Sequence, residues 1–183
     1  MSGLLIFGNQ RIAVDDRTEP SELAALLGNW QVTLDVTNLD PGRLPEHVTA
    51  TLYTEAAEFS VPQLRTSRGI DAPSATSFSA PQLQTSKNIN ACHATSFSVP
   101  QLQTAGHIDA SSAPHSSAPQ LRTAGCIDAS SATSFSAPQL QTSMGIAAEI
   151  ATIFDAPPDH RCCYTNIARR PTIVQRVRKM LRL

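Results

Sequence analysis

The sequence predicts a β-rich solenoid, a stack of 19-residue coils with an α/β cap at the N-terminus and a capping helix at the C-terminus. Three observations lead to this fold class. One unit of 19 residues is written five times between Phe59 and Ile153, its apolar residues fall in fixed columns, and the flanking segments lack the repeat. Self-similarity at a fixed short period is typical of solenoids, in which each unit buries its apolar side against its neighbours.

The repeated unit is too short for two helices and a turn, and it suits one short strand, two bends and an extended return. A sixth start at Phe154 breaks off at once. The units begin at Phe59, Phe78, Phe97, Ser116 and Phe135. Eight columns do not vary, and in the third unit they are Ser98, Pro100, Gln101, Leu102, Thr104, Ile108, Ala110 and Ala113.

The strand of each unit is predicted at its Ile-x-Ala segment, which spans residues 107–111 in the third unit. Proline cannot donate to a sheet ladder, so the Pro column is expected in a bend or at an edge. Alternation with a period of two points Ile108 and Ala110 towards the interior, where Leu102 and Ala113 join them. The outward residues are His107, Asp109 and Ser111.

Residues 1–43 are expected to form the N-terminal cap. A Gly-Asn pair at residues 8–9, between two apolar runs, predicts a hairpin turn. Residues 18–28 predict a helix that Thr18 caps, and the alternation over residues 30–37 predicts a strand. The inward face of that strand comprises Trp30, Val32, Leu34 and Val36.

The repeat solenoid is expected over residues 44–157, in which residues 44–58 form a degenerate first coil and residues 59–153 the five repeats. Compared with the later units, the first coil is expected to contain one extra residue, directly before Phe59. In the first coil, Leu44, Ala50 and Leu52 fall at the spacing of Leu64, Ile70 and Ala72.

Residues 158–183 are expected to form a basic C-terminal segment with a helix over residues 171–183. Its apolar stripe favours a cap over the open edge of the last coil, because exposed sheet edges invite aggregation. Phosphate contacts with nucleic acid and attraction to an anionic membrane are the alternatives. The basic residues of this tail are Arg169, Arg170, Arg176, Arg178, Lys179 and Arg182.

Charge is distributed unevenly along the chain, although the net charge is −1. Residues 1–58 hold nine acids and three bases (−6), residues 59–158 hold five and four (−1), and residues 159–183 hold one and seven (+6). Oppositely charged ends favour association, head to tail or with outside partners. A homo-oligomer is therefore one expectation.

Composition narrows the class of protein. Hydrophobic residues make up 41% of the 183 residues but aromatic residues only 5%, which predicts a small aliphatic core. No run approaches the ~18 apolar residues of a membrane span, and the N-terminus lacks the basic region and cleavage site of a secretory signal. The four cysteines show no disulfide-framework spacing, so we expect reduced thiols and a cytoplasmic location.

The unit has the pattern L-x5-I-x-A-x2-A-x2-F-x2-PQ and resembles a short leucine-rich repeat. This resemblance covers residues 44–157 and implies a strand followed by an extended, proline-bearing return. The period of 19 lies just below the ~20–29 residues of that class. A right-handed parallel β-helix, as in bactofilin-like polymers, is the alternative. The position that holds Asn in the family is occupied here by Ala75, Ala94, Ala113, Ala132 and Ala151.

The outward columns beside the predicted strand supply the candidate protein-binding residues. Like charges stacked at strand spacing cost stability unless they are solvated or paired. The acidic column therefore either binds a basic partner or cation, or is a solvated face that duplication copied along with the repeat, and the solvated face is the simpler account. The candidates are Asn88, Asn90, His107, Asp109, Cys126 and Asp128.

Catalytic, metal and cofactor sites are not expected. His107 and Cys126 should be stacked neighbours and are zinc-ligand types, but a flat strip does not assure four tetrahedral ligands. The sequence contains no G-x-S-x-G elbow and no phosphate-binding loop. The Thr column that includes Thr104 is similar to the arrays of ice-binding solenoids, but its partner column is an unmatched mixture.

These observations predict a non-enzymatic protein–protein interaction module that presents a strand face. The near-identity of the units indicates recent duplication, which suits an accessory protein of a phage or bacterium that binds and inhibits a host or defence protein. Two other function classes stay open. One is a self-assembling structural protein whose acidic start meets a basic end, and the other is a nucleic-acid or membrane-surface binder that uses residues 161–183.

Overall fold

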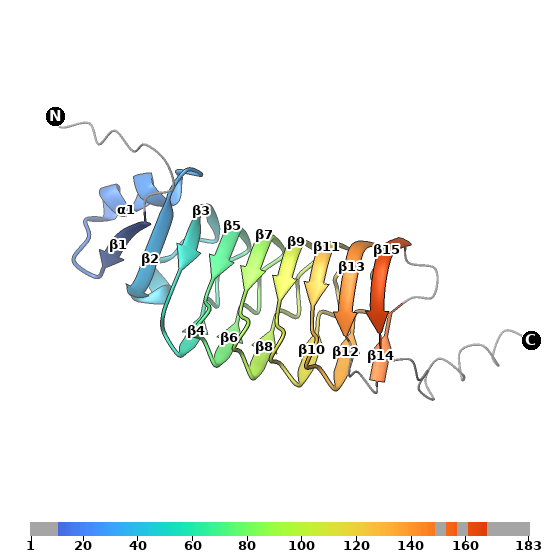
Figure 1. The fold of residues 1–183 in the computed structure, drawn as a ribbon. Coiled ribbons are helices and arrows are strands. Elements are labelled where there is room, and N and C mark those ends of the chain that lie inside the picture. The colour runs from blue at the N-terminus through green and yellow to red at the C-terminus, as the bar shows by residue number, and fades with distance from the viewer. Residues whose placement is uncertain (1–10, 149–152, 157–160, 168–183) are drawn as a thin grey trace, which may run out of the picture.

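The structure, a computed structural model, describes residues 11–148, 153–156 and 161–167. Two sheets of parallel strands run along the chain and form a β-solenoid (Figure 1). The long sheet has, in spatial order, β1 (Arg11–Asp15), β2 (Thr33–Asn38), β3 (His47–Tyr53), β5 (Thr66–Asp71), β7 (Thr85–Asn90), β9 (Thr104–Asp109), β11 (Thr123–Asp128), β13 (Thr142–Ala148) and β15 (Arg161–Ile167). The short sheet has β4 (Glu58–Ser60), β6 (Ser77–Ser79), β8 (Ser96–Ser98), β10 (His115–Ser117), β12 (Ser134–Ser136) and β14 (Ile153–Asp155).

Each coil contains one long strand, one short strand and two tight turns. After β9, the backbone N–H of Ala113 donates to the Ala110 carbonyl at 3.0 Å, and after β10 the N–H of Leu121 donates to the Ala118 carbonyl at 3.0 Å. The second turn encloses Pro119, so the prediction of the Pro column in a bend is confirmed. The extended return expected from the sequence is a strand of its own, and it builds the short sheet.

The long strand begins and ends earlier than predicted. In the third unit it spans Thr104–Asp109 rather than residues 107–111, because the turn already starts at Ala110. Both Ala105 and Ile108 are buried, so Gly106 and His107 lie together between two inward residues. Pairing with β11 skips Gly106 but keeps the same offset on both sides of it, so the departure from alternation is shared by neighbouring strands.

The interior of the coils follows the invariant columns. The Leu and Ile columns and the described members of both Ala columns are buried, as predicted. Phenylalanines of successive units stack inside the coil, and the rings of Phe78 and Phe97 lie 5.4 Å apart. Ser116 takes the Phe position in the fourth unit and pairs in register with Phe97 and Phe135. Its hydroxyl has no hydrogen-bond partner in the described part of the chain.

The N-terminal region extends the long sheet. β1 and β2 pair in parallel, and the helix α1 (Pro20–Leu27) connects them (Figure 1). The predicted apolar stripe of this helix is confirmed, since Leu23, Leu26 and Leu27 are buried. Thr18 is not the cap: the N-cap residue is Glu19, without a side-chain bond, and the Thr18 hydroxyl accepts instead from the Asp15 N–H at 3.1 Å.

The prediction that Trp30 faces the core is wrong. β2 begins at Thr33, and Trp30 is 57% exposed. The reason is a turn around Asn29, whose side-chain oxygen accepts from the Gln31 N–H at 3.0 Å. The alternation therefore starts only at Val32, which is buried as predicted, together with Leu34 and Val36.

The register of the first coil also differs from the prediction. Leu52, not Ala50, pairs with Ile70, and Val48 pairs with Ser67. The extra residue lies inside β3, between Val48 and Thr51, where the register shifts. Because the register has already shifted when Thr51 pairs with Gly69, the extra residue lies earlier than its predicted place before Phe59.

The solenoid continues beyond the point at which the repeat was expected to break off. β14 pairs with β12, so that Phe154 lies beside Phe135. β15 pairs with β13 from Thr142–Arg161 to Ala148–Ile167, which preserves the 19-residue offset. Backbone pairing therefore extends to residues that have lost the repeat sequence. The predicted helix over residues 171–183 and the basic tail residues from Arg169 to Arg182 lie outside the described residues.

Among the helices that the structure describes, none has the length and apolar character to cross a membrane.

Candidate functional site

The six candidate residues lie on three neighbouring strands of the long sheet, β7, β9 and β11. His107 pairs with Asn88 on one side and with Cys126 on the other, and Asp109 pairs in the same way with Asn90 and Asp128. Each of the six side chains is exposed or half-buried. None of the six belongs to the inward columns of Ala105 and Ile108. The structure therefore brings the six residues together as two rows on the outer face of the long sheet.

The row that contains Asp109 starts the turns of the solenoid. Asp109 accepts a hydrogen bond from the Ser111 N–H at 3.1 Å, Asp128 from the Ser130 N–H at 3.0 Å, and Asn90 from the Cys92 N–H at 3.3 Å. Asp and Asn side chains commonly bond to the backbone two residues on and so start a turn. This local role explains the Asp and Asn residues of the column, and no ligand is needed to explain them.

Asp71 belongs to the same column but cannot make this bond. The residue two positions later is Pro73, which has no backbone N–H. Its carboxylate accepts instead from the side-chain amide of Asn90 at 2.8 Å. Asn at position 90 thus bonds to the neighbouring coil as well as to its own turn.

The row of Asn88, His107 and Cys126 has no such internal role. All three side chains are exposed, and Cys126 is a free thiol. Within the described residues, no hydrogen bond joins Cys126 to His107 or His107 to Asn88. Nor does this part of the chain contain a group of three or more His, Cys, Asp or Glu side chains that could hold a metal ion. The row therefore exposes an amide, an imidazole and a thiol at the surface of the long sheet.

Beside this row the sheet surface is bare backbone. Gly106 and Gly125 occupy neighbouring positions on β9 and β11, and a Cβ atom on Gly106 would meet the Lys87 carbonyl oxygen at 2.2 Å. A Cβ atom on Gly125 would meet the Gly106 carbonyl oxygen at 2.1 Å. Real Cβ contacts are not this short, so close packing of neighbouring backbones requires glycine at both positions.

A second Cys-His pair lies in the turn after β7. The sulfur of Cys92 is 3.4 Å from Nδ1 of His93, but that nitrogen lies 2.6 Å from the Pro73 carbonyl oxygen. A ring nitrogen that donates to a carbonyl cannot also accept the proton of a thiol. The pair therefore ties the turn to the preceding coil and does not form a thiol–base pair through this nitrogen.

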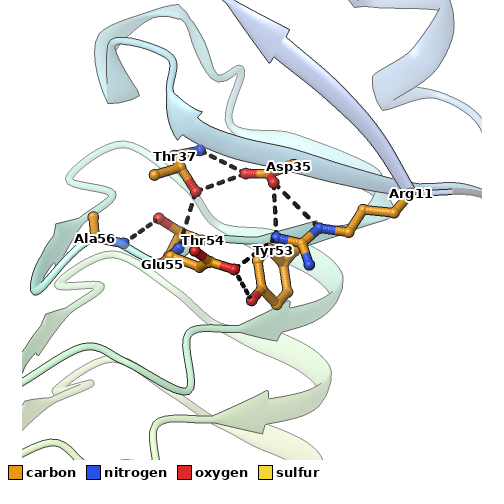
Figure 2. Close-up of polar contacts among 7 residues, drawn as sticks. All are labelled: Arg11, Asp35, Thr37, Tyr53, Thr54, Glu55 and Ala56. Atoms are coloured by element: carbon orange, nitrogen blue, oxygen red, sulfur yellow. Dashed lines mark hydrogen bonds and ion pairs between the residues drawn. The ribbon is translucent and has the colours of Figure 1, made fainter.

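Sequence reasoning missed a polar cluster at the N-terminal end of the same face (Figure 2). Arg11 of β1 donates from Nη2 to Asp35 of β2 at 2.8 Å and to Glu55 at 3.3 Å. Its guanidinium carbon lies 3.3 Å from the ring centre of Tyr53, whose hydroxyl donates to Glu55 at 2.8 Å. Three consecutive strands are tied together by one side chain, and spacing along the sequence gives no signal of it.

The neighbours of Asp35 complete this network. Its second oxygen accepts from both the backbone N–H and the hydroxyl of Thr37, at 3.1 and 2.6 Å. The Thr37 hydroxyl in turn accepts from the Glu55 N–H at 2.9 Å. Because the donors and acceptors of the cluster are engaged with one another, we interpret it as a structural tie between β1, β2 and β3.

The cluster shifts the pKa values of its members. Burial raises the pKa of Asp35, but the hydrogen bonds from Thr37 and Arg11 outweigh burial and lower it. The hydrogen bonds from Tyr53 and then Arg11 lower the pKa of Glu55, and the bond to Glu55 raises the pKa of Tyr53. Desolvation acts to lower the pKa of Arg11, while its bonds to Asp35 and Glu55 outweigh that effect and raise it.

Comparison of the chain with protein-family models, with curated proteins and with solved structures finds no match.

Proposed function

We propose that the chain is a non-enzymatic protein–protein interaction module whose binding surface is the outer face of β7, β9 and β11. The observation that carries this proposal is where the repeats differ from one another. One outward column of the short sheet holds the same residue in five coils, as Ser60, Ser79, Ser98, Ser117 and Ser136. In contrast, one column of the long sheet holds a different residue in each of four successive coils. These residues are Gly69, Asn88, His107 and Cys126.

The chemistry of this row suits recognition by contact. Asn88, His107 and Cys126 present an amide, an imidazole and a thiol at strand spacing of ~4.8 Å, next to the bare backbone at Gly106 and Gly125. A partner can approach such a surface closely, because no side chain projects from the two glycines. The row is exposed and lacks hydrogen bonds between its members, which supports a binding role rather than a catalytic one.

Affinity capture with matched variants tests this proposal. The triple variant Asn88→Ala/His107→Ala/Cys126→Ser removes the variable row, and Ser79→Ala/Ser98→Ala/Ser117→Ala makes three changes on the short sheet. Each immobilised protein is incubated with a bacterial lysate, and captured proteins are quantified by mass spectrometry after circular dichroism has shown that both variants are folded.

We expect the wild type and the Ser79/Ser98/Ser117 variant to capture the same partner. The Asn88/His107/Cys126 variant should capture at least tenfold less of it, which is roughly the effect of removing an interface hot spot. Retention of that partner by the triple variant would overturn the proposed surface. Enrichment of no protein by the wild type above empty beads would count against the interaction module itself.

A further inference from the structure

An aromatic–cation stack lies at the N-terminal end of the same outer face. Trp30 precedes β2 and is 57% exposed, and Arg68 of β5 places its guanidinium carbon 5.1 Å from the centre of the indole ring. Arg68 also donates from Nη1 to the Trp30 carbonyl oxygen. The stack fixes a large apolar side chain in an exposed position on this face.

The positive charges beside Trp30 have no negative partner within the described residues. The ion pairs of the described residues are made by Arg11 and Arg65. Neither Arg68 nor Lys87 takes part in one. These two cations occupy the same column on the neighbouring strands β5 and β7, since the residues on either side of them pair in register. Like charges on adjacent strands repel one another, so an anion that contacts both would relieve the repulsion.

Further along the face, exposed surface continues to a second apolar side chain. Gly106 and Gly125 follow Lys87 in the same column, and Met144 comes next on β13. Met144 is 61% exposed, and it and Trp30 are the large hydrophobic side chains that the described residues expose. Trp, Arg and Met are enriched at protein interfaces, and Trp and Arg dominate their energetic hot spots.

We propose that Trp30, Arg68 and Lys87 anchor an acidic segment of the partner protein, which crosses the bare backbone at Gly106 and Gly125 towards Met144. This inference rests on the proposed function and names the chemistry of the partner. The planar guanidinium of Arg68 matches a carboxylate, and Lys87 adds a second positive charge. Apolar side chains of the same segment pack on the indole ring.

A discrete acidic segment fits this face better than a nucleic acid does. Asp71, Asp109 and Asp128 form a row along the ends of the same strands. A continuous line of phosphates, whose binding depends on accumulated positive charge, would meet these carboxylates. A peptide can place its acids at Arg68 and Lys87 and leave neutral or basic residues opposite the aspartates.

Fluorescence anisotropy with defined probes tests the inference. The probe is a labelled peptide of the composition Leu-Glu-Glu-Leu-Glu-Glu-Leu, with its Lys-for-Glu counterpart and a labelled twelve-nucleotide deoxyadenosine strand as comparisons. The variants are Trp30→Ala, Lys87→Glu and the charge-matched control Arg122→Glu, which alters an exposed arginine outside the proposed contact.

The wild type should bind the Glu peptide and not the Lys peptide. Trp30→Ala should weaken binding about 30-fold, as at an interface hot spot, and Lys87→Glu about tenfold, while Arg122→Glu leaves it unchanged. Absence of Glu-peptide binding, equal losses in Lys87→Glu and Arg122→Glu, or tighter binding of the oligonucleotide would each overturn the inference.

The same variants separate this inference from the proposed function. If the partner captured from lysate is retained by Lys87→Glu and Trp30→Ala but lost from the Asn88/His107/Cys126 variant, the variable row binds the partner and the acidic-segment inference fails. If Glu-peptide binding is lost from Trp30→Ala while no protein is captured at all, the anchor stands and the proposed function fails.

Discussion

At the scale of single residues, the last residue of the long strands β7, β9 and β11 acts on its own turn. The side chains of Asp109 and Asp128 each accept a hydrogen bond from the backbone N–H of the residue two positions later. Asn90 accepts a comparable bond. Each such bond contributes about 0.5–1.5 kcal/mol to stability. This local bond accounts for the side chains of Asn90, Asp109 and Asp128 in the column.

The described interior of the array is imperfect at two buried serines whose hydroxyls lack a hydrogen-bond partner, Ser143 and Ser116. Ser116 also interrupts the column of phenylalanines. It is buried in the column that holds Phe97 and Phe135, and its hydroxyl is unsatisfied within the described residues. Ser116→Phe should stabilise the protein by about 1–3 kcal/mol, because it buries an aromatic ring and removes an unpaired polar group. Thermal unfolding followed by circular dichroism measures the change.

Ser117→Phe is the matched control for this prediction, since Ser117 is the outward neighbour on the same strand and should give no gain in melting temperature. A lower melting temperature for Ser116→Phe than for the wild type would show that the fourth coil has closed around serine and cannot accept the ring.

Sequence reasoning identified the buried columns but misplaced residues whose environment depends on turns. Leu102 and Ile108 are buried as predicted, because hydrophobic residues at a fixed period have one common interior. Trp30 was placed inside by extending an alternation that the turn at Asn29 interrupts. The bond between Arg68 and Trp30 joins residues 38 positions apart, a contact for which a local pattern holds no information.

At the scale of elements, the long strand of each coil departs from simple alternation. A strand of strict period two cannot place both Ala105 and Ile108 inward, so the alternation breaks at Gly106 and His107. Because the prediction assumed strict alternation, it placed the start of the strand at residue 107, whereas the strand begins at Thr104. The break in alternation also leaves two successive residues exposed on β7 and β9, Lys87 with Asn88 and Gly106 with His107.

The tie between β1, β2 and β3 predicts a pH-dependent contribution to stability. The folded-state pKa values of Asp35 and Glu55 are lowered from 3.8 and 4.5, so folding favours their ionised forms. The stabilisation is therefore complete above those ordinary values and is lost as the pH falls through the lower folded values. Arg11→Met should lower the melting temperature at pH 7, and this deficit should be smaller at pH 3.

Melting curves of the wild type and of Arg11→Met at both pH values, at one ionic strength, provide the measurement. Arg65→Met serves as the control, because Arg65 makes one exposed ion pair with Glu46 at 3.0 Å and spans fewer strands. An equal deficit of Arg11→Met at pH 7 and pH 3 would mean that its stacking on Tyr53, not its ion pairs, provides the stabilisation.

At the scale of the whole molecule, the solenoid keeps its register after the sequence stops repeating. The pairing of β15 with β13 has the same 19-residue offset as the repeats, although Arg161–Ile167 shares almost nothing with the repeat consensus. A preceding coil presents a complete parallel edge, and backbone hydrogen bonds along it do not depend on side-chain identity. For this reason the end of the repeat in sequence did not predict the end of the solenoid in space.

The central claim is that coils of 19 residues are interchangeable units of one stack. Deleting residues 116–134 removes one whole unit and brings His115 next to Phe135 in the original register. Deleting residues 116–133 removes one residue fewer and places Ser134 in the Phe column with Phe135 turned outward. A slip of one residue moves every following side chain to the opposite face of a strand.

Thermal unfolding of these two deletion variants, followed by circular dichroism, is the most direct test. The 19-residue deletion should retain the β-sheet spectrum and a cooperative melt within about 10 °C of the wild type, since the remaining units keep their nearest-neighbour contacts. The 18-residue deletion should lose the cooperative transition. Indistinguishable melts for the two variants, or loss of folding in both, would contradict the account of the chain as a stack of 19-residue coils.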